Sequence, residues 1–475
     1  MKGDFTRDTF DPSKHYSRVL QQQGRVQLDA DWNEQTAIVL HYLRTLARDL
    51  IGPHGGPVRG NGFVIITDVK NVTDADGLEL TDAERLKVLE AAIEKGDFVI
   101  GAGRYYVEGI LVENDAPITY SEQAGYPFDD KTARDALKAW KKDLAFYLDV
   151  WERHITYVED DHIREVALGG PDTATRAQIV WQVKVLLQAN ETGLTCDSIN
   201  TVLLPTGTGR LRARARLDQP QTELCVIPPA SRYRGAENQL YRVEIHRGGE
   251  IDASGGPTFK WSRENGSVIF PVISVGAAAS GETTVLLASL GRDDRLGLQV
   301  GDWVEVVDDQ YVLQNRSDAL LQVTKIEELT VTLAGLTNVA SGGKNKLLRR
   351  WDQQGDVKLD GALQVVEHDD TAGDSKDDWI PLEDGVQIRF AKGGKYRTGD
   401  YWLIPARVAT GDVDWPHEFD ANGNERPDEN KNPVGAAMLA HGPRHYYAPL
   451  GVRHGSASNV DPCRCTIRAI DCPMP

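Results

Sequence analysis

The sequence predicts a mainly β protein of the α+β class, divided into several small β-sandwich or barrel units with a few N-terminal helices. Three observations predict this class. Short apolar runs recur along most of the 475 residues, and turn residues separate them, as in sandwiches and barrels. The 45 glycines and 22 prolines slightly exceed the usual share and favour many turns. The two helical periodicities that we identify both lie before residue 96.

The first predicted helix spans about residues 31–50. Asp29 or Asp31 can cap its start, and Gly52-Pro53 ends it. Its apolar residues fall on one stripe at helical spacing, and these are Leu28, Trp32, Val39, Leu40, Leu43, Leu46 and Leu50. We interpret the stripe as ordinary core packing. The alternative is an oligomer or docking face.

The elements that follow mix one further helix with strands. A turn-forming linker at 53–57 precedes a strand at 62–66. The second helix spans about residues 82–95, with Thr81 and Glu84 as a capping box and Gly96 after its end. The next expected segments are strands at 98–100, 104–112, 144–151 and 178–186, with a polar loop at 159–176.

Residues 190–235 are rich in Pro, Thr, Arg and Gly, which indicates a boundary. After them, closely spaced strands predict a small sandwich or barrel, with runs at 240–245, 258–261, 267–270, 284–287 and 303–307. The predicted organisation is therefore an N-terminal arm and helix (1–60), an α+β domain (61–190), a linker with an Arg-rich strand (191–235), a β-sandwich or barrel (236–350) and a C-terminal β- and loop-rich domain (351–475).

Composition narrows the class of function. The formal net charge of −18 argues against nucleic-acid binding, because such proteins usually carry a basic field. No window approaches the ~20 apolar residues of a membrane span, so we expect no membrane insertion. The start of the chain lacks the features of a signal peptide, and five cysteines are too few for a disulfide scaffold. We expect synthesis in a reducing cytoplasm, while a particle released by lysis would act outside the cell.

An arginine-rich run is the most unusual local pattern. In a strand, Arg210, Arg212, Arg214 and Arg216 would stand on one face, with Leu and Ala on the other. Four like charges at ~7 Å spacing repel one another unless acidic groups meet them. One interpretation is a solvated or protected edge strand. The other is a docking stripe for an acidic patch on another subunit, with an anionic glycan or nucleic acid as a further alternative.

Two segments contain residue types that bind metals. Asp420, Asn422, Asn424 and Asp428 place oxygen ligands at alternate positions, which suits calcium, but the glycine is fourth where an EF-hand has it sixth. A polar loop is the alternative. Residue types that zinc accepts gather near the C-terminus, namely His441, His445, His454, Cys463, Cys465 and Cys472. The C-x-C spacing is unusual for zinc, and free thiols or a disulfide of Cys463 or Cys465 with Cys472 are the alternatives. We expect no cofactor.

Linear enzyme motifs are absent. The chain contains no G-x-S-x-G, H-E-x-x-H or G-x-x-x-x-G-K-[ST] sequence. Paired carboxylates for glycoside hydrolysis are defined by their separation in space, which sequence does not give. Five tryptophans could form a sugar platform but are more typical of a core, and these are Trp140, Trp151, Trp181, Trp261 and Trp303.

Several strings resemble a known family. They are KGDFTRDTFD (2–11), HYSRVLQQQGRVQLDADWNE (15–34), YLDVWER (147–153), ALGGPDTATR (167–176), FKWSRENGS (259–267) and GDYWLIPAR (399–407). On these strings the chain resembles a family of unknown function encoded beside phage-tail-like contractile injection systems. The resemblance implies a particle component and supplies no catalytic residues.

We therefore expect a structural or docking component of such a particle, in the peripheral baseplate, a fibre or an anchoring module. Its expected partners are other subunits of the particle and further copies of itself. The arm, Lys2 to Gln23, is too polar to fold alone, so we expect a neighbour to capture it through Phe5, Phe10, Tyr16 and Arg18. The alternative function is a carbohydrate-binding or glycoside-cleaving module carried by the particle.

Overall fold

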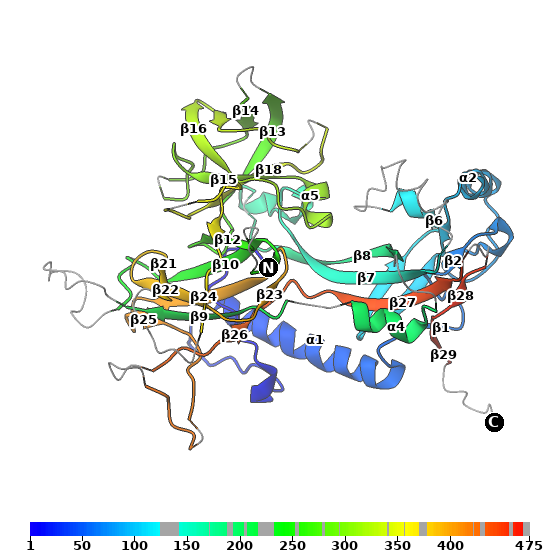
Figure 1. Cartoon of the computed structure of the whole chain (residues 1–475), viewed down its shortest axis with the longest axis horizontal. Helices are drawn as coiled ribbons and strands as arrows, with labels where there is room; N and C mark the ends of the chain where they lie inside the picture. Colours follow the sequence, from blue (N-terminus) through cyan, green and yellow to red (C-terminus); the bar gives the residue numbers. More distant parts are fainter. Residues whose placement is uncertain are drawn as a thin grey trace, which may run out of the picture.

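The structure is a computed structural model of the whole chain. Its described part comprises residues 1–123, 142–170, 172–187, 193–203, 207–216, 232–251, 256–277, 281–293, 295–339, 342–355, 357–369, 378–420, 422–427, 433–455 and 459–468. The fold is mainly β, as predicted, and it includes a closed six-stranded barrel. Figure 1 shows two β-rich bodies side by side, with the barrel above one of them and the helix α1 (Asp29–Ile51) below.

The first β-rich body joins the early part of the chain to its end. Its three sheets have the strand orders β28-β27-β7-β8, β29-β1-β4-β5 and β2-β3-β6. Their shared core contains Phe63, Tyr105, Val150 and Leu450. The strands are β1 (His54–Pro57), β2 (Ile65–Ile66), β3 (Val99–Ile100), β4 (Gly103–Val107), β5 (Ile110–Asn114), β6 (Ile118–Thr119), β7 (Leu144–Ile155), β8 (Arg176–Leu187), β27 (Tyr446–Arg453), β28 (Asp461–Pro462) and β29 (Thr466–Ile467).

The second β-rich body packs two larger sheets around one core. Their strand orders are β19-β12-β10-β24-β25 and β20-β22-β9-β26, with β21 also paired to β22 and a separate β11-β23 pair. The core contains Leu211, Tyr241, Phe390 and Trp402. The strands are β9 (Arg210–Ala215), β10 (Gln239–Arg247), β11 (Gly249–Glu250), β12 (Thr258–Ser262), β19 (Leu363–Gln364), β20 (Glu367–His368), β21 (Ile380–Pro381), β22 (Val386–Ala391), β23 (Lys395–Tyr396), β24 (Tyr401–Arg407), β25 (Asp412–Val413) and β26 (Met438–Leu439).

The barrel is inserted in the chain between β12 and β19. It closes in the order β13-β14-β17-β16-β15-β18, and its interior is filled by side chains such as Phe270, Val285 and Leu333. This confirms the expected small barrel. The strands are β13 (Ile269–Ala277), β14 (Thr283–Leu287), β15 (Trp303–Val307), β16 (Leu321–Glu327), β17 (Thr330–Leu333) and β18 (Leu347–Trp351).

The described helices are few and mostly short. Besides α1 they are α2 (Ala83–Glu94), α4 (Cys196–Val202) and α5 (Asp309–Leu313), with 3-10 turns η1 (Pro12–Lys14), η2 (Val69–Asn71), η3 (Tyr120–Glu122), η4 (Asp161–Ile163) and η5 (Val166–Leu168). Both predicted N-terminal helices form, but their caps differ from the expectation. Leu28 is the N-cap residue of α1 and makes no side-chain cap. Asp82, rather than Thr81, caps α2 by accepting from the N–H groups of Glu84 and Arg85.

The strand expected at 104–112 is a hairpin. β4 and β5 pair antiparallel, with Val107 opposite Ile110. Glu108 and Gly109 both adopt a positive φ, of 49° and 77°, as a two-residue type I′ turn requires. The apolar run concealed this turn in the sequence.

Strand pairing crosses the expected domain boundaries. β9, placed in the linker 191–235, lies inside a sheet between β22 and β26. β24, from the expected C-terminal domain, pairs with β10, and β27 pairs with β7. The division at 236–350 and 351–475 is therefore wrong, because partners far apart in sequence share sheets.

A disulfide fixes the end of the chain to α4. It joins Cys196 and Cys463, which are 267 positions apart, while Cys465 is a free, exposed thiol. Cys463 also packs on a small apolar cluster that contains Ile199 and Val452. The pairing of Cys463 with Cys472 is therefore wrong, and Cys472 lies outside the described residues.

We expect loss of this disulfide to destabilise the protein. A cross-link over so long a loop restricts the unfolded chain strongly, and removing a native disulfide typically costs about 2–5 kcal/mol. Cys196→Ser should lower the free energy of unfolding by an amount in this range, as measured by urea denaturation. Cys465→Ser is the matched control and should leave the midpoint in place. Equal midpoints for the oxidised protein and the Cys196→Ser variant would contradict the prediction.

His246 on β10 is buried without a hydrogen-bond partner for either ring nitrogen among the described residues. Burial and the nearby Lys260 charge lower the pKa of His246 to about 4. As the pH falls, the imidazole of His246 is therefore protonated in the unfolded chain before it is protonated in the folded protein. The free energy of unfolding should fall as the pH drops from about 6.5 to about 4.

The expected loss from His246 by pH 4 is roughly 3 kcal/mol. His246→Leu removes the titrating group, so its unfolding free energy should depend less steeply on pH within this window. Unfolding titrations of both proteins at several pH values measure the difference. Identical pH slopes would show that His246 does not titrate on unfolding in this way.

Candidate functional site

The start of the arm is locked inside its own chain. Lys2 Nζ lies 2.9 Å from Glu244 Oε1, and Asn265 Nδ2 donates to the Gly3 carbonyl at 2.9 Å. Arg407 Nη2 donates to the Thr6 carbonyl at 2.8 Å. These contacts attach the first residues to β10 and β24 of the second β-rich body. Residues 2–6 are therefore bound within their own chain, and capture of the arm by another chain stays a prediction.

A buried group of charges surrounds this attachment and joins it to the barrel. Lys260 Nζ on β12 lies 2.5 Å from Glu305 Oε1 on β15 and 3.6 Å from Glu244 Oε1. Tyr311 Oη also donates to Glu305, at 2.6 Å. Burial alone would raise the pKa of Glu305, but the charges of Lys260 and Lys2 outweigh it and lower the pKa to about 2. Glu305 therefore stays ionised, and the contacts of this cluster link barrel, sheet and arm.

Beyond residue 5 the arm runs beside α1. The Thr6 N–H donates to Asp29 Oδ2 at 2.8 Å, and Thr9 Oγ1 donates to Glu34 Oε2 at 2.6 Å. Burial opposes ionisation of Asp29, but the hydrogen bonds from Thr6 prevail and lower its pKa. Further along, the Val19 N–H donates to Gln35 Oε1 at 2.8 Å. The arm thus lies against one side of the helix.

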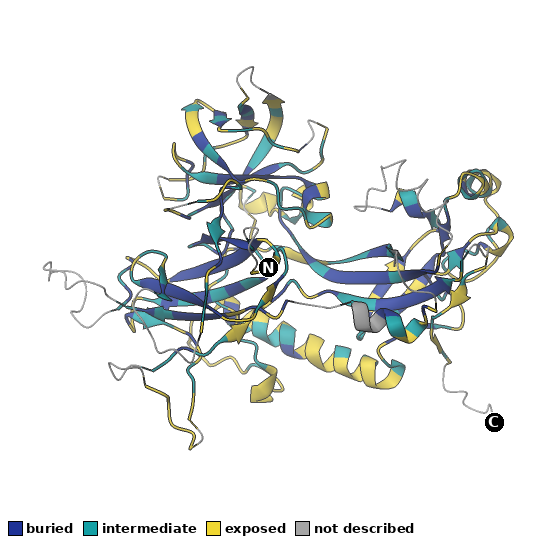
Figure 2. Cartoon of the chain, in the orientation of Figure 1, coloured by how far each residue is buried: buried dark blue, intermediate teal, exposed yellow. Residues whose placement is uncertain are grey.

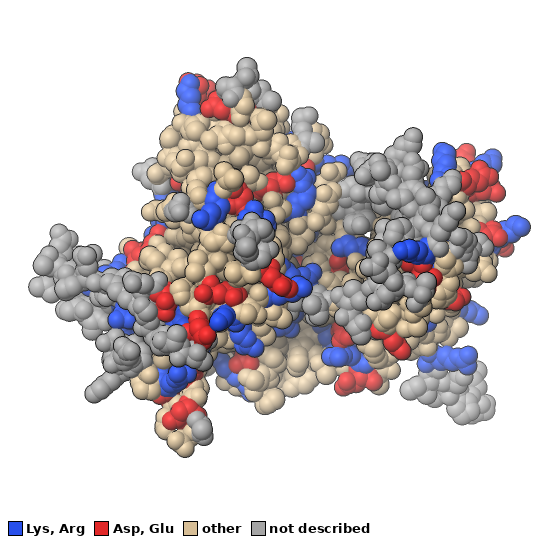
Figure 3. Space-filling model, viewed as in Figure 1, with Lys and Arg blue, Asp and Glu red and all other residues tan. Residues whose placement is uncertain are grey.

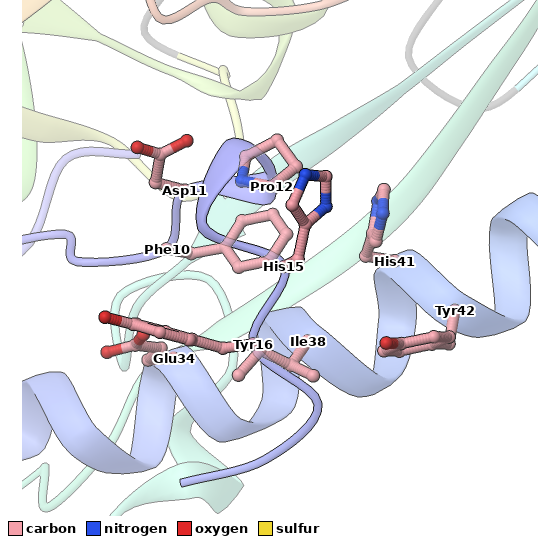
Figure 4. Close-up of a pocket in the computed structure, with 9 residues that line it drawn as sticks. All are labelled: Phe10, Asp11, Pro12, His15, Tyr16, Glu34, Ile38, His41 and Tyr42. Carbon is pink, nitrogen blue, oxygen red and sulfur yellow. The ribbon is translucent and has the colours of Figure 1, made fainter.

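A cavity of about 200 Å³ opens between arm and helix. Figure 4 shows that aromatic rings, imidazoles and carboxylates line it together. The ring centroids of Phe10 and His41 are 5.7 Å apart. This lining suits an apolar or aromatic group that carries a hydrogen-bond donor. The lining residues are Phe10, Asp11, Pro12, His15, Tyr16, Glu34, Ile38, His41 and Tyr42.

The apolar stripe of α1 faces water. Figure 2 shows the helix largely exposed, and only Ala30 and Ile38 are buried among its 23 residues. The exposed fraction is 60% for Trp32 and 75% for Leu50. The interpretation as core packing is therefore wrong. The exposed members are Leu28, Trp32, Val39, Leu40, Leu43, Leu46 and Leu50, with Tyr42 beside them.

Polar contacts hold the opposite side of α1 to the first β-rich body. Arg44 pairs with Glu152 at 2.8 Å, and Arg48 pairs with Glu108 at 2.9 Å. The hairpin turn approaches so closely that a Cβ on Gly109 would lie 2.1 Å from the Arg44 carbonyl oxygen. Ion pairs with exposed groups contribute little, about 0–1 kcal/mol each. The helix is thus positioned with its apolar stripe outward.

We name residues 11–28 and the exposed stripe of α1 the N-terminal surface. Residues 11–28 are almost entirely exposed, and apart from η1 they form no helix or strand. Of the expected contact residues, Tyr16 and Arg18 lie on this surface. Phe5 instead contacts His154, with ring centroids 5.9 Å apart, and Phe10 contacts His41. Sequence reasoning named Phe10 and Tyr16 but missed the other cavity residues, because no local pattern shows where the arm returns to the helix.

The arginine run forms the strand β9, as its alternation predicted. Leu211, Ala213 and Ala215 point into the core. Arg210, Arg212 and Arg214 make side-chain contacts within the chain, which argues against a docking stripe formed by all four arginines. Arg212 is buried, and its Nη1 lies 2.6 Å from Glu418 Oε1. The guanidinium carbon of Arg214 lies 3.8 Å from the centroid of the Trp379 ring. Arg210 donates to the Ala437 carbonyl at 3.0 Å, and Arg216, just after β9, is partly buried.

Three of the calcium candidates, Asp420, Asn422 and Asn424, lie at a hairpin tip. Asp420 Oδ1 accepts from the N–H groups of Asn422 and Asn424, both at 2.9 Å, and these hydrogen bonds lower its pKa. Asp428 lies outside the described residues. A carboxylate that closes its own turn is typical of a polar loop. Within the described ranges, no group of three or more His, Cys, Asp or Glu could hold a metal ion.

The histidines expected near zinc have separate partners. His445 Nδ1 lies 2.7 Å from Asp149 Oδ1, and His454 Nδ1 lies 3.1 Å from Asp143 Oδ2. His441 stacks on Tyr401, with centroids 5.9 Å apart. Because Cys463 is disulfide-bonded, the members of this set that the structure describes do not meet as a zinc site.

The tryptophans do not form a sugar platform in the described structure. Trp151 and Trp261 are buried, Trp181 and Trp303 are partly buried, and Trp140 lies outside the described residues. The carboxylates of Glu244 and Glu305 both contact Lys260, but both are almost fully buried and closed to a polysaccharide. The core interpretation of the four described tryptophans is confirmed.

Surface charge and helix composition add two observations. Figure 3 shows basic and acidic side chains interspersed over the visible face, without a broad basic field on its described part. None of the described helices has the length and apolar character needed to cross a membrane.

Fold and surface together define a β-rich protein with an uncovered apolar helix at its N-terminus. The chain belongs to the Family of unknown function (DUF6519), which it matches over residues 1–204 and 189–472. No curated protein and no solved structure matches it.

Proposed function

We propose that this protein is a structural docking component of a larger assembly. Following the family resemblance, the assembly is a phage-tail-like contractile injection particle, in which the chain occupies the peripheral baseplate, a fibre or an anchoring module. The observation that supports this most is the exposed apolar stripe of α1. Large contiguous apolar surfaces of soluble proteins mark contact sites.

The energetics favour a covered helix. Burying a large apolar side chain is worth about 1.5–3 kcal/mol, so covering the stripe makes on the order of 10 kcal/mol available before association costs. The arm adds an extended, exposed segment whose backbone a neighbour can order. Anchoring of residues 1–6 beside the barrel fixes where that segment begins.

The disulfide between Cys196 and Cys463 fits work outside a reducing compartment. A particle subunit made in the cytoplasm and released with the particle meets that condition. The partners that bind this protein are then other subunits of the same particle.

Purification of intact particles from a producing strain tests this proposal. A tagged full-length chain should co-purify with the particles, and Leu46→Glu should remove it from them. Leu359→Glu is the matched control, because Leu359 is a fully exposed leucine far along the chain. Absence of the wild-type chain from pure particles, or equal retention of the Leu46→Glu chain, would refute the proposal.

A further inference from the structure

The apolar stripe of α1 has the spacing of a coiled-coil seam. Within it Trp32, Val39, Leu43, Leu46 and Leu50, together with the polar Thr36, follow one another at intervals of three and four residues, a repeat of 3.5 residues on average. Assigning Trp32, Val39 and Leu46 to d positions places Leu43 and Leu50 at a positions, with Thr36 as the polar a residue. Leu40 and Ala47 widen this seam on its e side, and Tyr42 widens it on its g side. The 3.5-residue repeat of the seam therefore fits another α-helix.

The length of the seam restricts the partner. α1 contains 23 residues and is about 34 Å long, whereas α2, the next longest helix of the described part, has 12 residues. Both copies of α1 in a pair present the same uncovered seam. A second copy of this chain therefore supplies a helix of matching length and matching apolar pattern.

The residues flanking the seam permit two copies to meet despite the net charge of −18. The e positions are Asn33, Leu40 and Ala47, and the g positions are Gln35, Tyr42 and Asp49. Only Asp49 carries a charge. Arg44 and Arg48 are turned to the other side, where they pair with Glu152 and Glu108. No repulsive row of like charges thus borders the seam.

An antiparallel arrangement fits the pattern best. A parallel pair would set the two Asp29 carboxylates opposite each other at an a position, which is repulsive. In an antiparallel pair, Trp32 meets Leu50, Val39 meets Leu43, and Leu40 lies beside its own copy near the twofold axis. The helix dipoles also oppose each other favourably.

We propose that α1 pairs antiparallel with α1 of a second copy, so that the docking component of the proposed function enters its assembly as a dimer. The inference rests on the proposed function only for the assembly that the dimer enters. A seam about 34 Å long and about 10 Å wide covers roughly 350 Å² per copy, below the ~800 Å² per partner of a stable interface. The pair is therefore reversible, and residues 11–28 with exposed Tyr16, Leu20 and Val26 extend it.

Light scattering and cross-linking of the full-length chain test the pairing. The mass should rise from one chain toward two with concentration, and Leu43→Glu should raise the dissociation constant more than about tenfold. Val166→Glu, at an exposed site on η5, is the control and should not change it. For cross-linking, Cys225, Cys465 and Cys472 are replaced by Ser. Leu40→Cys should then cross-link to itself, and a Trp32→Cys and Leu50→Cys mixture should cross-link while each alone does not.

A monomer at every concentration would overturn the pairing, as would a dimer that Leu43→Glu leaves intact. Efficient self-cross-linking of Leu50→Cys would overturn the antiparallel arrangement. If the wild-type chain stays monomeric yet co-purifies with particles through Leu46, the proposed function stands and self-pairing fails. Circular dichroism of each variant checks that it folds.

Discussion

Glu305→Leu should lower the free energy of unfolding by about 3–5 kcal/mol. Glu305 is almost fully buried and contacts Lys260 at 2.5 Å and Tyr311 at 2.6 Å. Its removal leaves the Lys260 ammonium with Glu244, 3.6 Å away, as its remaining carboxylate. An incompletely paired buried charge is costly, and barrel and sheet meet at this point. Urea denaturation of the two proteins measures the difference.

Two controls separate burial from ion pairing as such. Glu327→Leu breaks the exposed Lys325–Glu327 pair, at 2.7 Å, and should change stability by less than about 1 kcal/mol. Adding Lys260→Met to Glu305→Leu should restore part of the loss, because no excess charge then stays buried. A Glu305→Leu effect as small as that of Glu327→Leu would contradict the account of the cluster.

The Leu43→Glu/Leu46→Glu variant should lose association while the isolated chain keeps its stability. Both leucines are more than half exposed, so their replacement disturbs little within the chain. In an interface, burial of each leucine side chain would contribute about 1.5–3 kcal/mol to the free energy of association. In the variant, the new carboxylates would instead lose their hydration. We expect association to weaken at least about 100-fold, as measured by analytical ultracentrifugation.

The melting temperature of the same variant serves as its internal control and should stay near the wild-type value. A large drop would show that the stripe is covered within the chain. Unchanged association would show that the stripe is not a contact surface.

The sequence predicted the position and extent of α1 well, but it did not predict that the apolar stripe of the helix faces solvent. Periodicity tells which side chains share a face, and Leu43 and Leu46 do share one. It does not tell what covers that face. That depends on the body to which Arg44 and Arg48 attach, and their partners Glu152 and Glu108 are remote in sequence.

The strand β9 shows the same division between local and non-local information. Alternation correctly placed Leu211 and Ala213 on one face of an extended strand. The neighbours of Arg212 could not be predicted, because Glu418 and the Gly435 carbonyl lie more than 200 positions away. The Cys196–Cys463 pair spans a similar distance and escaped prediction for the same reason.

A cryo-EM map of the assembly that contains this chain tests the central claim most directly, since the claim is that another chain covers the N-terminal surface. The account predicts a helix packed along Trp32, Val39, Leu43 and Leu46, with residues 11–28 in contact with a neighbour. A map in which α1 stays bare while a different face of the protein makes the contacts would contradict it.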